Sequence, residues 1–233
     1  MRSGFVCIIG RPNAGKSTLL NALVGEKLAI VTHKPQTTRN RIQGIVNVPK
    51  KKNRPAAQIV LVDTPGVHRS ETSLDKKMMQ EIRDALHGCN LILLIVDATE
   101  RVHEDKFVFD LIKHADTPVF LLLNKIDKVA KDKLLETMDQ YARMYSFREI
   151  IPISAMKKDG LDDLLTTIIK ALPEGPAYFP KDQITDQPAR FMAAETIREQ
   201  VLMDTAQEVP YAATVMIEQF EESEKLTRIA AVI

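Results

Sequence analysis

The stretch GRPNAGKS at residues 10–17 constrains the fold more than any other part of this sequence. Five apolar residues at 5–9 precede it, and leucines at helical spacing follow it. The stretch matches G-x-x-x-x-G-K-[ST], in which glycines let successive backbone N–H groups curl around an anion at the amino end of a helix. It predicts a phosphate-binding loop between a buried strand and a helix. A glycine-rich turn with a solvated lysine is the plainer alternative.

The residue types in this loop suit a nucleotide and its metal ion. Lys16 would bring a mobile positive charge to the β- and γ-phosphates, and the Ser17 hydroxyl is placed to ligate Mg²⁺. We expect the following loop residues to bind the nucleotide: Asn13, Ala14, Gly15, Lys16, Ser17 and Thr18.

A second candidate element is DTPG at residues 63–66, directly after the β-rich segment 58–62. A carboxylate at a strand end beside a phosphate-binding loop can hold Mg²⁺ through water, which assigns this role to Asp63. Gly66 would let a backbone N–H approach a γ-phosphate. Without the loop at 10–17, an ordinary Pro-Gly turn would explain these residues equally well.

A third element, NKID at residues 124–127, follows the apolar run 119–123 and bears on the choice of base. Guanine presents two adjacent donors, N1–H and the 2-amino group, and one aspartate accepts both. Adenine has no matching pair, so Asp127 is the predicted specificity residue. Ser154-Ala155, at the end of the next expected strand, would place a backbone N–H near guanine O6. Together these elements predict further nucleotide contacts at Asp63, Gly66, Asn124, Lys125, Asp127, Ser154 and Ala155.

Apolar runs alternate with helix-period segments along residues 1–172. Strands are expected at 5–9, 42–48, 58–62, 91–97, 119–123 and 150–153, and helices at 17–24, 74–86, 104–114, 131–145 and 161–172. Continuous apolar runs are typical of strands that are covered on both faces. The order predicts an α/β domain over residues 1–172, with a mostly parallel sheet, helices on both faces and one antiparallel strand supplied by a hairpin.

The composition changes after residue 172. Four prolines fall within residues 173–188 and predict an interdomain linker, while Tyr178 and Phe179 favour its docking on the first domain. Residues 189–233 predict one helix at 189–206 and two strands at 212–221 and 226–233. So few elements rarely stabilise themselves, and we expect an α+β second domain that is incomplete in this chain.

In their order, each at the carboxyl end of an expected strand, GRPNAGKS, DTPG, NKID and SA resemble the motifs of the translation-factor-like branch of the Ras-like P-loop GTPases. The resemblance implies Mg²⁺-dependent hydrolysis of GTP to GDP, with Lys16, Thr38 and Gly66 as the catalytic set. Segments 32–41 and 67–75 would be the two switch loops, whose order depends on the γ-phosphate. Thr38 best matches the threonine that closes over Mg²⁺, with Thr37 as the alternative. The implied metal ligands are Ser17, Thr38 and Asp63.

One position departs from this family. Val67 stands where Ras-like proteins carry a water-orienting glutamine, and a valine cannot position water by hydrogen bonding. We expect slow intrinsic turnover, comparable with the unaided rate of Ras, about 10⁻⁴–10⁻³ s⁻¹, or modestly faster. In related GTPases that lack the glutamine, an asparagine at the position of Asn13 helps to hold a K⁺ ion. The resemblance thus implies K⁺ as a second cofactor, and a simple turn role for Asn13 is the alternative.

Segments beyond these motifs narrow the resemblance. QTTR at 36–39, YFPKDQITD at 178–186, RFMAAETIREQV at 190–201 and EVPYAATV at 208–215 resemble a family of bacterial GTPases that join a G domain to a C-terminal KH domain. The family implies binding of the 3′ end of 16S rRNA during assembly of the 30S subunit, and no DNA partner. It also implies a cytoplasmic protein that associates peripherally with the inner membrane.

The RNA contacts themselves cannot be assigned from these residues. The Gly-x-x-Gly loop that clamps RNA in KH domains does not occur in residues 189–233, and in this family it lies further along the chain. Lys+Arg 32 against Asp+Glu 31 leaves no global basic bias, so an RNA surface would be a local patch. The strongest basic cluster is an expected hairpin tip, for which a solvated turn is the favoured interpretation: Lys50, Lys51, Lys52 and Arg54.

A second functional hypothesis is a membrane-associated regulatory switch whose second domain binds protein or lipid. The longest purely apolar run, 91–96, is far shorter than a membrane span, and no basic amphipathic helix supports this hypothesis. The linker and the segment 190–201 favour the ribosomal hypothesis instead.

Overall fold

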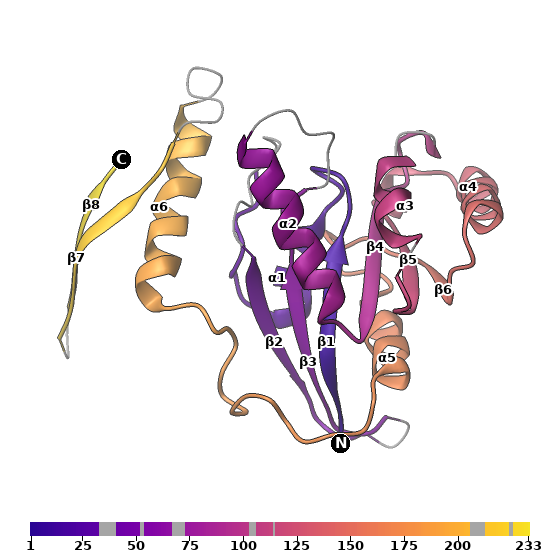
Figure 1. Ribbon diagram of the computed structural model, residues 1–233, viewed down its shortest axis with the longest axis horizontal. Helices are drawn as coiled ribbons and strands as arrows, with labels where there is room; N and C mark the ends of the chain where they lie inside the picture. The colour runs from indigo at the N-terminus through magenta and orange to yellow at the C-terminus, as the bar shows by residue number, and fades with distance from the viewer. Residues whose placement is uncertain are drawn as a thin grey trace.

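The strands of the first 172 residues pair into one sheet in the order β2-β3-β1-β4-β5-β6 (Figure 1). The computed structural model describes residues 1–32, 41–51, 54–66, 73–102, 106–113, 115–205, 213–223 and 226–233. The strands are β1 (Arg2–Ile9), β2 (Ile42–Val48), β3 (Ala57–Asp63), β4 (Leu91–Asp97), β5 (Val119–Asn124) and β6 (Glu149–Pro152). All neighbours pair in parallel except β2, which is antiparallel to β3. The predicted α/β sheet with one antiparallel strand is confirmed.

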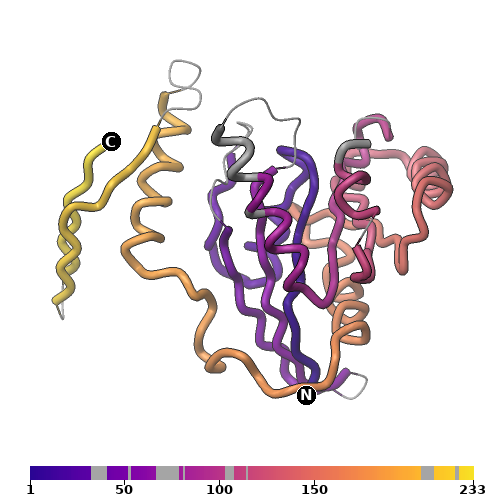
Figure 2. The backbone as a smooth tube through the Cα atoms, in the orientation of Figure 1, coloured from indigo at the N-terminus to yellow at the C-terminus, as the bar shows by residue number. Residues whose placement is uncertain are grey.

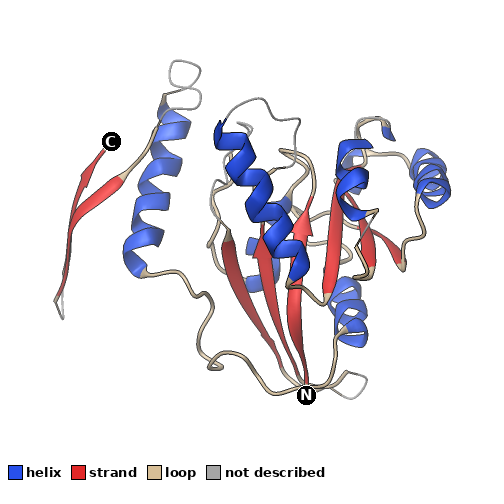
Figure 3. Cartoon of the chain, in the orientation of Figure 1, coloured by secondary structure: helices blue, strands red, loops and turns tan. Residues whose placement is uncertain are grey.

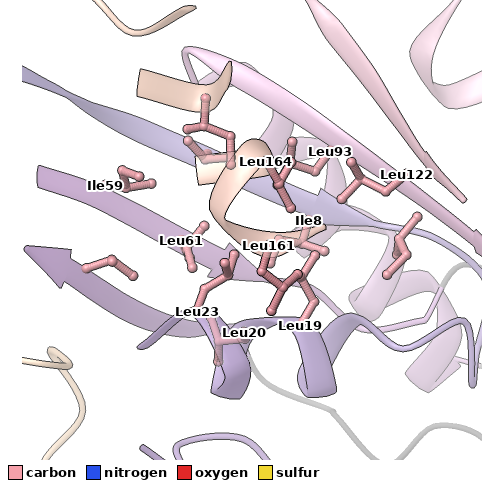
Figure 4. Close-up of a cluster of buried hydrophobic side chains, with 14 of the residues drawn as sticks. Ile8, Leu19, Leu20, Leu23, Ile59, Leu61, Leu93, Leu122, Leu161 and Leu164 are labelled. Carbon is pink, nitrogen blue, oxygen red and sulfur yellow. The ribbon is translucent and has the colours of Figure 1, made fainter. Parts of the chain in front are cut away.

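Helices cover both faces of this sheet (Figure 3). They are α1 (Lys16–Val24), α2 (Ser73–His87), α3 (Lys106–Ile112), α4 (Lys131–Met144) and α5 (Leu161–Ala171). Buried leucines of α1 and α5 belong to one core cluster (Figure 4), and buried residues of α2, α3 and α4 belong to the other. Because both faces are covered, β3, β4 and β5 are buried along their whole length.

The helix α5 illustrates how the sequence produces this packing. Gly160, with φ of 73°, precedes the helix, and Leu161, Leu164 and Ile168 follow at helical spacing. Leu164 and Ile168 are fully buried against the sheet. Asp162 lies in the first turn, where a negative charge is favourable. The apolar face therefore sets which side of α5 faces the sheet.

The segment 173–188 docks along the first domain. It passes from α5 beside the N-terminus, where the Gly175 N–H donates to the Met1 carbonyl, and then reaches α6 (Figure 2). The buried side chain of Gln58 accepts from the N–H groups of Tyr178 and Phe179 at 2.7 and 2.9 Å. These bonds fix the segment to β3.

The second part of the chain contains α6 (Ala189–Asp204) and an antiparallel pair, β7 (Met216–Glu222) and β8 (Thr227–Val232). The strand expected at 212–221 begins only at Met216, since residues 213–215 are irregular. The helix expected at 104–114 is described from Lys106 to Ile112. These elements agree with the incomplete α+β unit that the sequence predicts. Within the described ranges, no helix is both long and apolar enough to cross a membrane.

Candidate functional site

The predicted site residues meet at the carboxyl edge of the parallel sheet, where α/β proteins bind their ligands. They surround a cavity of about 400 Å³, a size typical of small-molecule sites. The residues that line it are Pro12, Asn13, Gly15, Lys16, Ser17, Thr18, Ile30, Val31, Thr32, Gly66, Asn124, Lys125, Asp127, Lys128, Ser154 and Met156. Three further predicted residues, Ala14, Asp63 and Ala155, are buried. Thr38, its alternative Thr37, and Val67 lie outside the described residues.

The backbone of the loop at 10–17 adopts a conformation that only glycine allows at one position. Gly15 has φ of 104°, and a Cβ atom there would lie 2.1 Å from Nδ2 of Asn124. The loop therefore packs directly against the end of β5, at the amino end of α1, where helix N–H groups favour an anion. This is a local reason for the second glycine of the motif.

Lys16 lies folded back into the loop. Its Nζ donates to the carbonyls of Gly10 and Arg11 at 3.0 and 2.8 Å, and the side chain is buried. Burial lowers the pKa of Lys16 to about 8, although the negative charge of Asp63 opposes this shift. An anion in the cavity would stabilise the charged amine, so the loop is poised for a phosphate group.

Asp63 is a buried carboxylate with an incomplete set of partners. Oδ2 accepts from the Ser17 hydroxyl at 2.8 Å, whereas Oδ1 has no hydrogen-bond partner among the described residues. Burial raises the pKa of Asp63 to about 6, and the charge of Lys16 and the bond from Ser17 oppose this shift. A divalent cation would compensate the buried charge and use oxygen ligands of the kind that Mg²⁺ prefers. Ser17 and Asp63 thus fit the implied magnesium ion.

Replacing Asp63 with asparagine tests this description of the buried charge. In the metal-free protein the folded state binds more protons at Asp63 than the unfolded chain does between about pH 4 and pH 6. The stability contributed by the protonated carboxyl is therefore lost as the pH rises through about 6. In EDTA at pH 8, Asp63→Asn should raise the free energy of unfolding by up to about 3 kcal/mol. Near pH 4 the two proteins should be equally stable.

Thermal unfolding at both pH values measures this effect, and the same variant should lose the stabilisation that Mg²⁺ and GDP together give the wild type. If the variant is less stable than the wild type at pH 8 in EDTA, the ionised Asp63 carboxylate does not destabilise the metal-free protein, and this description of the buried charge is wrong.

The other end of the cavity holds the carboxylate of Asp127. It accepts from the Ser154 hydroxyl at 2.6 Å, and this bond is the main cause that lowers its pKa. Asp127 is exposed, while Ser154 is buried and fixed by the strand before it. The carboxylate therefore stays ionised at neutral pH and is oriented by a rigid neighbour.

Asn124 connects the two ends of the site. Its Nδ2 donates to the Ala14 carbonyl at 2.8 Å, and its Oδ1 accepts from the Ala155 N–H at 2.9 Å. Both backbone N–H groups of the Ser154-Ala155 pair, one of which the sequence assigned to guanine O6, thus have partners in this structure, since that of Ser154 donates to the Asp159 carbonyl at 3.1 Å. Asn124 holds the phosphate-binding loop and the loop after β6 at a constant separation.

Lys125, which lines the cavity, pairs with a residue that the sequence did not suggest. Its Nζ pairs with Oδ2 of Asp97 at 2.5 Å, and its backbone has φ of 66°. Burial alone would raise the pKa of Asp97, but hydrogen bonds from Lys125 and Thr99 lower it. The aliphatic part of Lys125 is therefore fixed beside the cavity.

Sequence reasoning also missed part of the cavity wall. Ile30, Val31 and Thr32 follow α1 in an irregular segment, and Met156 follows the Ser154-Ala155 pair. The side chain of Asn21 organises this wall, because Oδ1 accepts from the N–H groups of Leu28 and Ala29, both at 2.9 Å. The apolar run 28–31 after a helix was the available signal.

Comparison with known proteins places this geometry among GTPases. A family model described as "50S ribosome-binding GTPase" matches residues 5–125. GTPase Era of Syntrophus aciditrophicus is 49% identical over the whole chain, which covers 75% of that protein. GTPase Era of Geobacter metallireducens is 50% identical, again over the whole chain and over 77% of that protein.

Two solved structures resemble the entire architecture. A crystal structure of Aquifex aeolicus Era bound to GDP·AlF4⁻ has a TM-score of 0.89 and 40% identity, covering 96% of this chain and 75% of that one. A structure of Era in complex with MgGDPNP and nucleotides 1506–1542 of 16S ribosomal RNA has a TM-score of 0.87 and 38% identity, covering 96% and 74%. The likeness therefore includes the second part of the chain.

Proposed function

Because this chain belongs to the Era family of GTPases and hydrolyses GTP, we propose that it is a nucleotide-controlled switch in assembly of the 30S ribosomal subunit, which it contacts through 16S rRNA. The observation that carries this proposal is the likeness over 96% of the chain to an Era structure that holds both MgGDPNP and a 16S rRNA segment. That likeness extends through α6 and β7, beyond the GTPase domain.

The proposed nucleotide site uses both ends of the cavity. Lys16 and the N–H groups of residues 13–18 bind the phosphates, and the N–H of Gly66 faces the γ-phosphate. Asp127 accepts from N1–H and the 2-amino group of guanine, in the orientation that Ser154 sets. Asn124 keeps these two regions at the spacing of one nucleotide.

Magnesium belongs to the same site. Ser17 and Asp63 would hold it, and Thr38 is the proposed third ligand. The ion would offset the charge that develops on the β- and γ-phosphates. Asp63 contributes by remaining ionised next to Lys16, and the Ser17 hydroxyl is already directed towards that carboxylate.

The proposed division of the chain follows the fold. Residues 1–172 form the GTPase domain, 173–188 form the linker, and 189–233 form the first part of a KH-type RNA-binding domain. Docking of the linker on Gln58 and the antiparallel pair of β7 and β8 support these boundaries. We also propose a cytoplasmic location, with peripheral membrane association as a further expectation from the family.

Co-sedimentation of the full-length protein with 30S subunits tests the ribosomal role. We expect more protein in the subunit fraction with GDPNP than with GDP, because the γ-phosphate sets the state of the switch loops. Purified 50S subunits provide the control. Equal binding in both nucleotides would contradict a switch, and flotation with anionic vesicles in place of sedimentation would favour the membrane hypothesis.

Potassium stimulation is a separate prediction about Asn13. Asn13 lies in the cavity wall with φ of 62°, a conformation in which asparagine is enriched among non-glycine residues. We expect GTP turnover severalfold faster in potassium chloride than in sodium chloride at equal ionic strength. Asn13→Gly, which keeps access to this backbone conformation but removes the oxygen, should abolish the stimulation and leave GDP affinity nearly unchanged. Equal turnover of the wild type in both salts would contradict potassium stimulation and favour the alternative, in which Asn13 has only a structural role in the turn.

A further inference from the structure

A buried carboxylate of the second domain contacts the wall of the nucleotide cavity. Glu199 lies on α6 and is only 4% exposed. Its Oε1 accepts from the backbone N–H of Val31 at 3.2 Å, and its Oε2 pairs with Nζ of Lys27 at 2.5 Å. A buried carboxylate is costly unless both oxygens are satisfied. Here the partners of both oxygens come from the GTPase domain, so the position of Glu199 depends on that domain.

The segment that Glu199 holds is part of the cavity itself. Ile30, Val31 and Thr32 line the cavity, and the chain between Lys27 and Val31 runs immediately before the proposed first switch loop. Asn21 fixes the start of this segment through Leu28 and Ala29. Glu199 fixes its end, where Val31 itself is 38% exposed. Without the Glu199 carboxylate, the Val31 N–H would lose its hydrogen bond to α6.

The other flank of the same loop is bonded to the chain that leads into α6. The Ile45 N–H donates to the Ile184 carbonyl at 2.8 Å, and the Thr185 hydroxyl donates to the Gln43 carbonyl at 2.7 Å. Gln43 and Ile45 belong to β2, which begins at residue 42. Residues on both sides of the segment 32–41 are therefore bonded to residues 184–199.

The docking of α6 also has an apolar component. Phe191 and Met192 pack against the core cluster that contains the buried residues of α1 and β2. Glu199 lies two helical turns further along α6, at a spacing that keeps it on the same side of the helix as Met192. The helix is thus anchored at one end by packing and at the other by a charge-assisted hydrogen bond.

We propose that Glu199 is a positioning residue of the nucleotide site, through which docking of α6 holds the cavity wall at Val31 and slows nucleotide release. The inference rests on the nucleotide site proposed above. It makes the affinity for GDP depend on a residue of the second domain that lies outside the four sequence motifs. Any event that moves α6 away from residues 27–31 would accordingly speed nucleotide exchange.

The test compares three variants of the full chain by the dissociation rate of a fluorescent GDP analogue. Glu199→Met keeps the volume but removes both acceptor oxygens, and it should release GDP about three- to tenfold faster, the range expected for one hydrogen bond. Glu199→Gln keeps an oxygen for the Val31 N–H and should restore a rate near that of the wild type. Glu195→Met makes the change of Glu199→Met one turn away, where the carboxylate pairs with Arg198 of α6, and should leave the rate unchanged.

Two further readouts separate positioning from general stability. In GTP hydrolysis, Glu199→Met should raise KM while kcat stays within twofold, because the reacting groups are untouched. Melting temperatures are measured for all variants, and Glu199→Ala replaces Glu199→Met if the latter does not fold. A lower melting temperature with unchanged release and KM would overturn the proposal, and so would slower release. Failure of the nucleotide site itself would appear differently, as a wild type that does not bind the GDP analogue.

Discussion

Lys16→Ala should weaken GDP binding on the order of a thousandfold. Removal of one member of a buried, hydrogen-bonded charge pair costs about 4 kcal/mol, and each 1.4 kcal/mol is a factor of ten. The effect should be large here because Lys16 is buried in the loop, where no water can replace its charge on a phosphate.

Isothermal titration calorimetry with GDP and Mg²⁺ measures this change. Lys113→Ala is the matched control, because Lys113 is an exposed lysine that pairs only with Asp110 within the bonds described for its side chain. Burial lowers the pKa of Lys16 to about 8, so the empty loop holds the amine at some cost. We therefore expect the variant to fold with an undiminished melting temperature. A variant that binds GDP within tenfold of the wild type would refute the role of Lys16.

Asp127→Asn should exchange guanine for xanthine as the preferred base. An asparagine presents one acceptor and one donor, whereas the carboxylate presents two acceptors. Xanthine carries an oxygen where guanine carries the 2-amino group, so the donor of asparagine meets an acceptor. Sites built to hydrogen-bond a ligand reject an unmatched analogue by about 10⁴-fold or more. We expect GTP affinity to fall by this order and XTP affinity to rise.

Direct calorimetric titration of the wild type and the variant with GTP, XTP and ATP gives the three affinities. Ser154→Ala is the matched control for orientation: it removes the 2.6 Å bond to Asp127 but leaves both acceptors, so it should weaken GTP without creating a preference for XTP. An Asp127→Asn protein that still prefers GTP over XTP would show that the base is selected by another group.

Local sequence patterns were sufficient to predict the fold and to select most of the residues that the structure brings together at the cavity. The continuous apolar runs at 91–96 and 119–123 identified β4 and β5, because strands covered on both faces need no polar alternation. The motifs at the strand ends selected Lys16, Asp63 and Asp127 through residue type and spacing alone, and the structure places all three in or beside one cavity. Such features can be predicted from the sequence because each depends on a few consecutive residues.

Other features could not be predicted from the sequence because they join residues that are far apart in the chain. Asn124 was predicted to contact the nucleotide, and the structure adds its bonds to Ala14 and Ala155, which depend on the spacing of three loops. The pairing of Lys125 with Asp97 likewise depends on the register of β4 and β5. No local pattern contains either relation.

The sequence by itself determined the GTPase class of this protein and which residues gather at the cavity, among them those to which we assign the phosphate, the metal ion and the guanine base, since motif spacing specifies backbone shape within one strand–loop–helix unit. Only the tertiary structure decided that Val31 and Glu199, 168 residues apart, share a hydrogen bond. Such a contact arises from the docking of α6 and of the linker before it, whose free energy is spread over many side chains. The physical link between the second domain and the nucleotide cavity is therefore a property of packing.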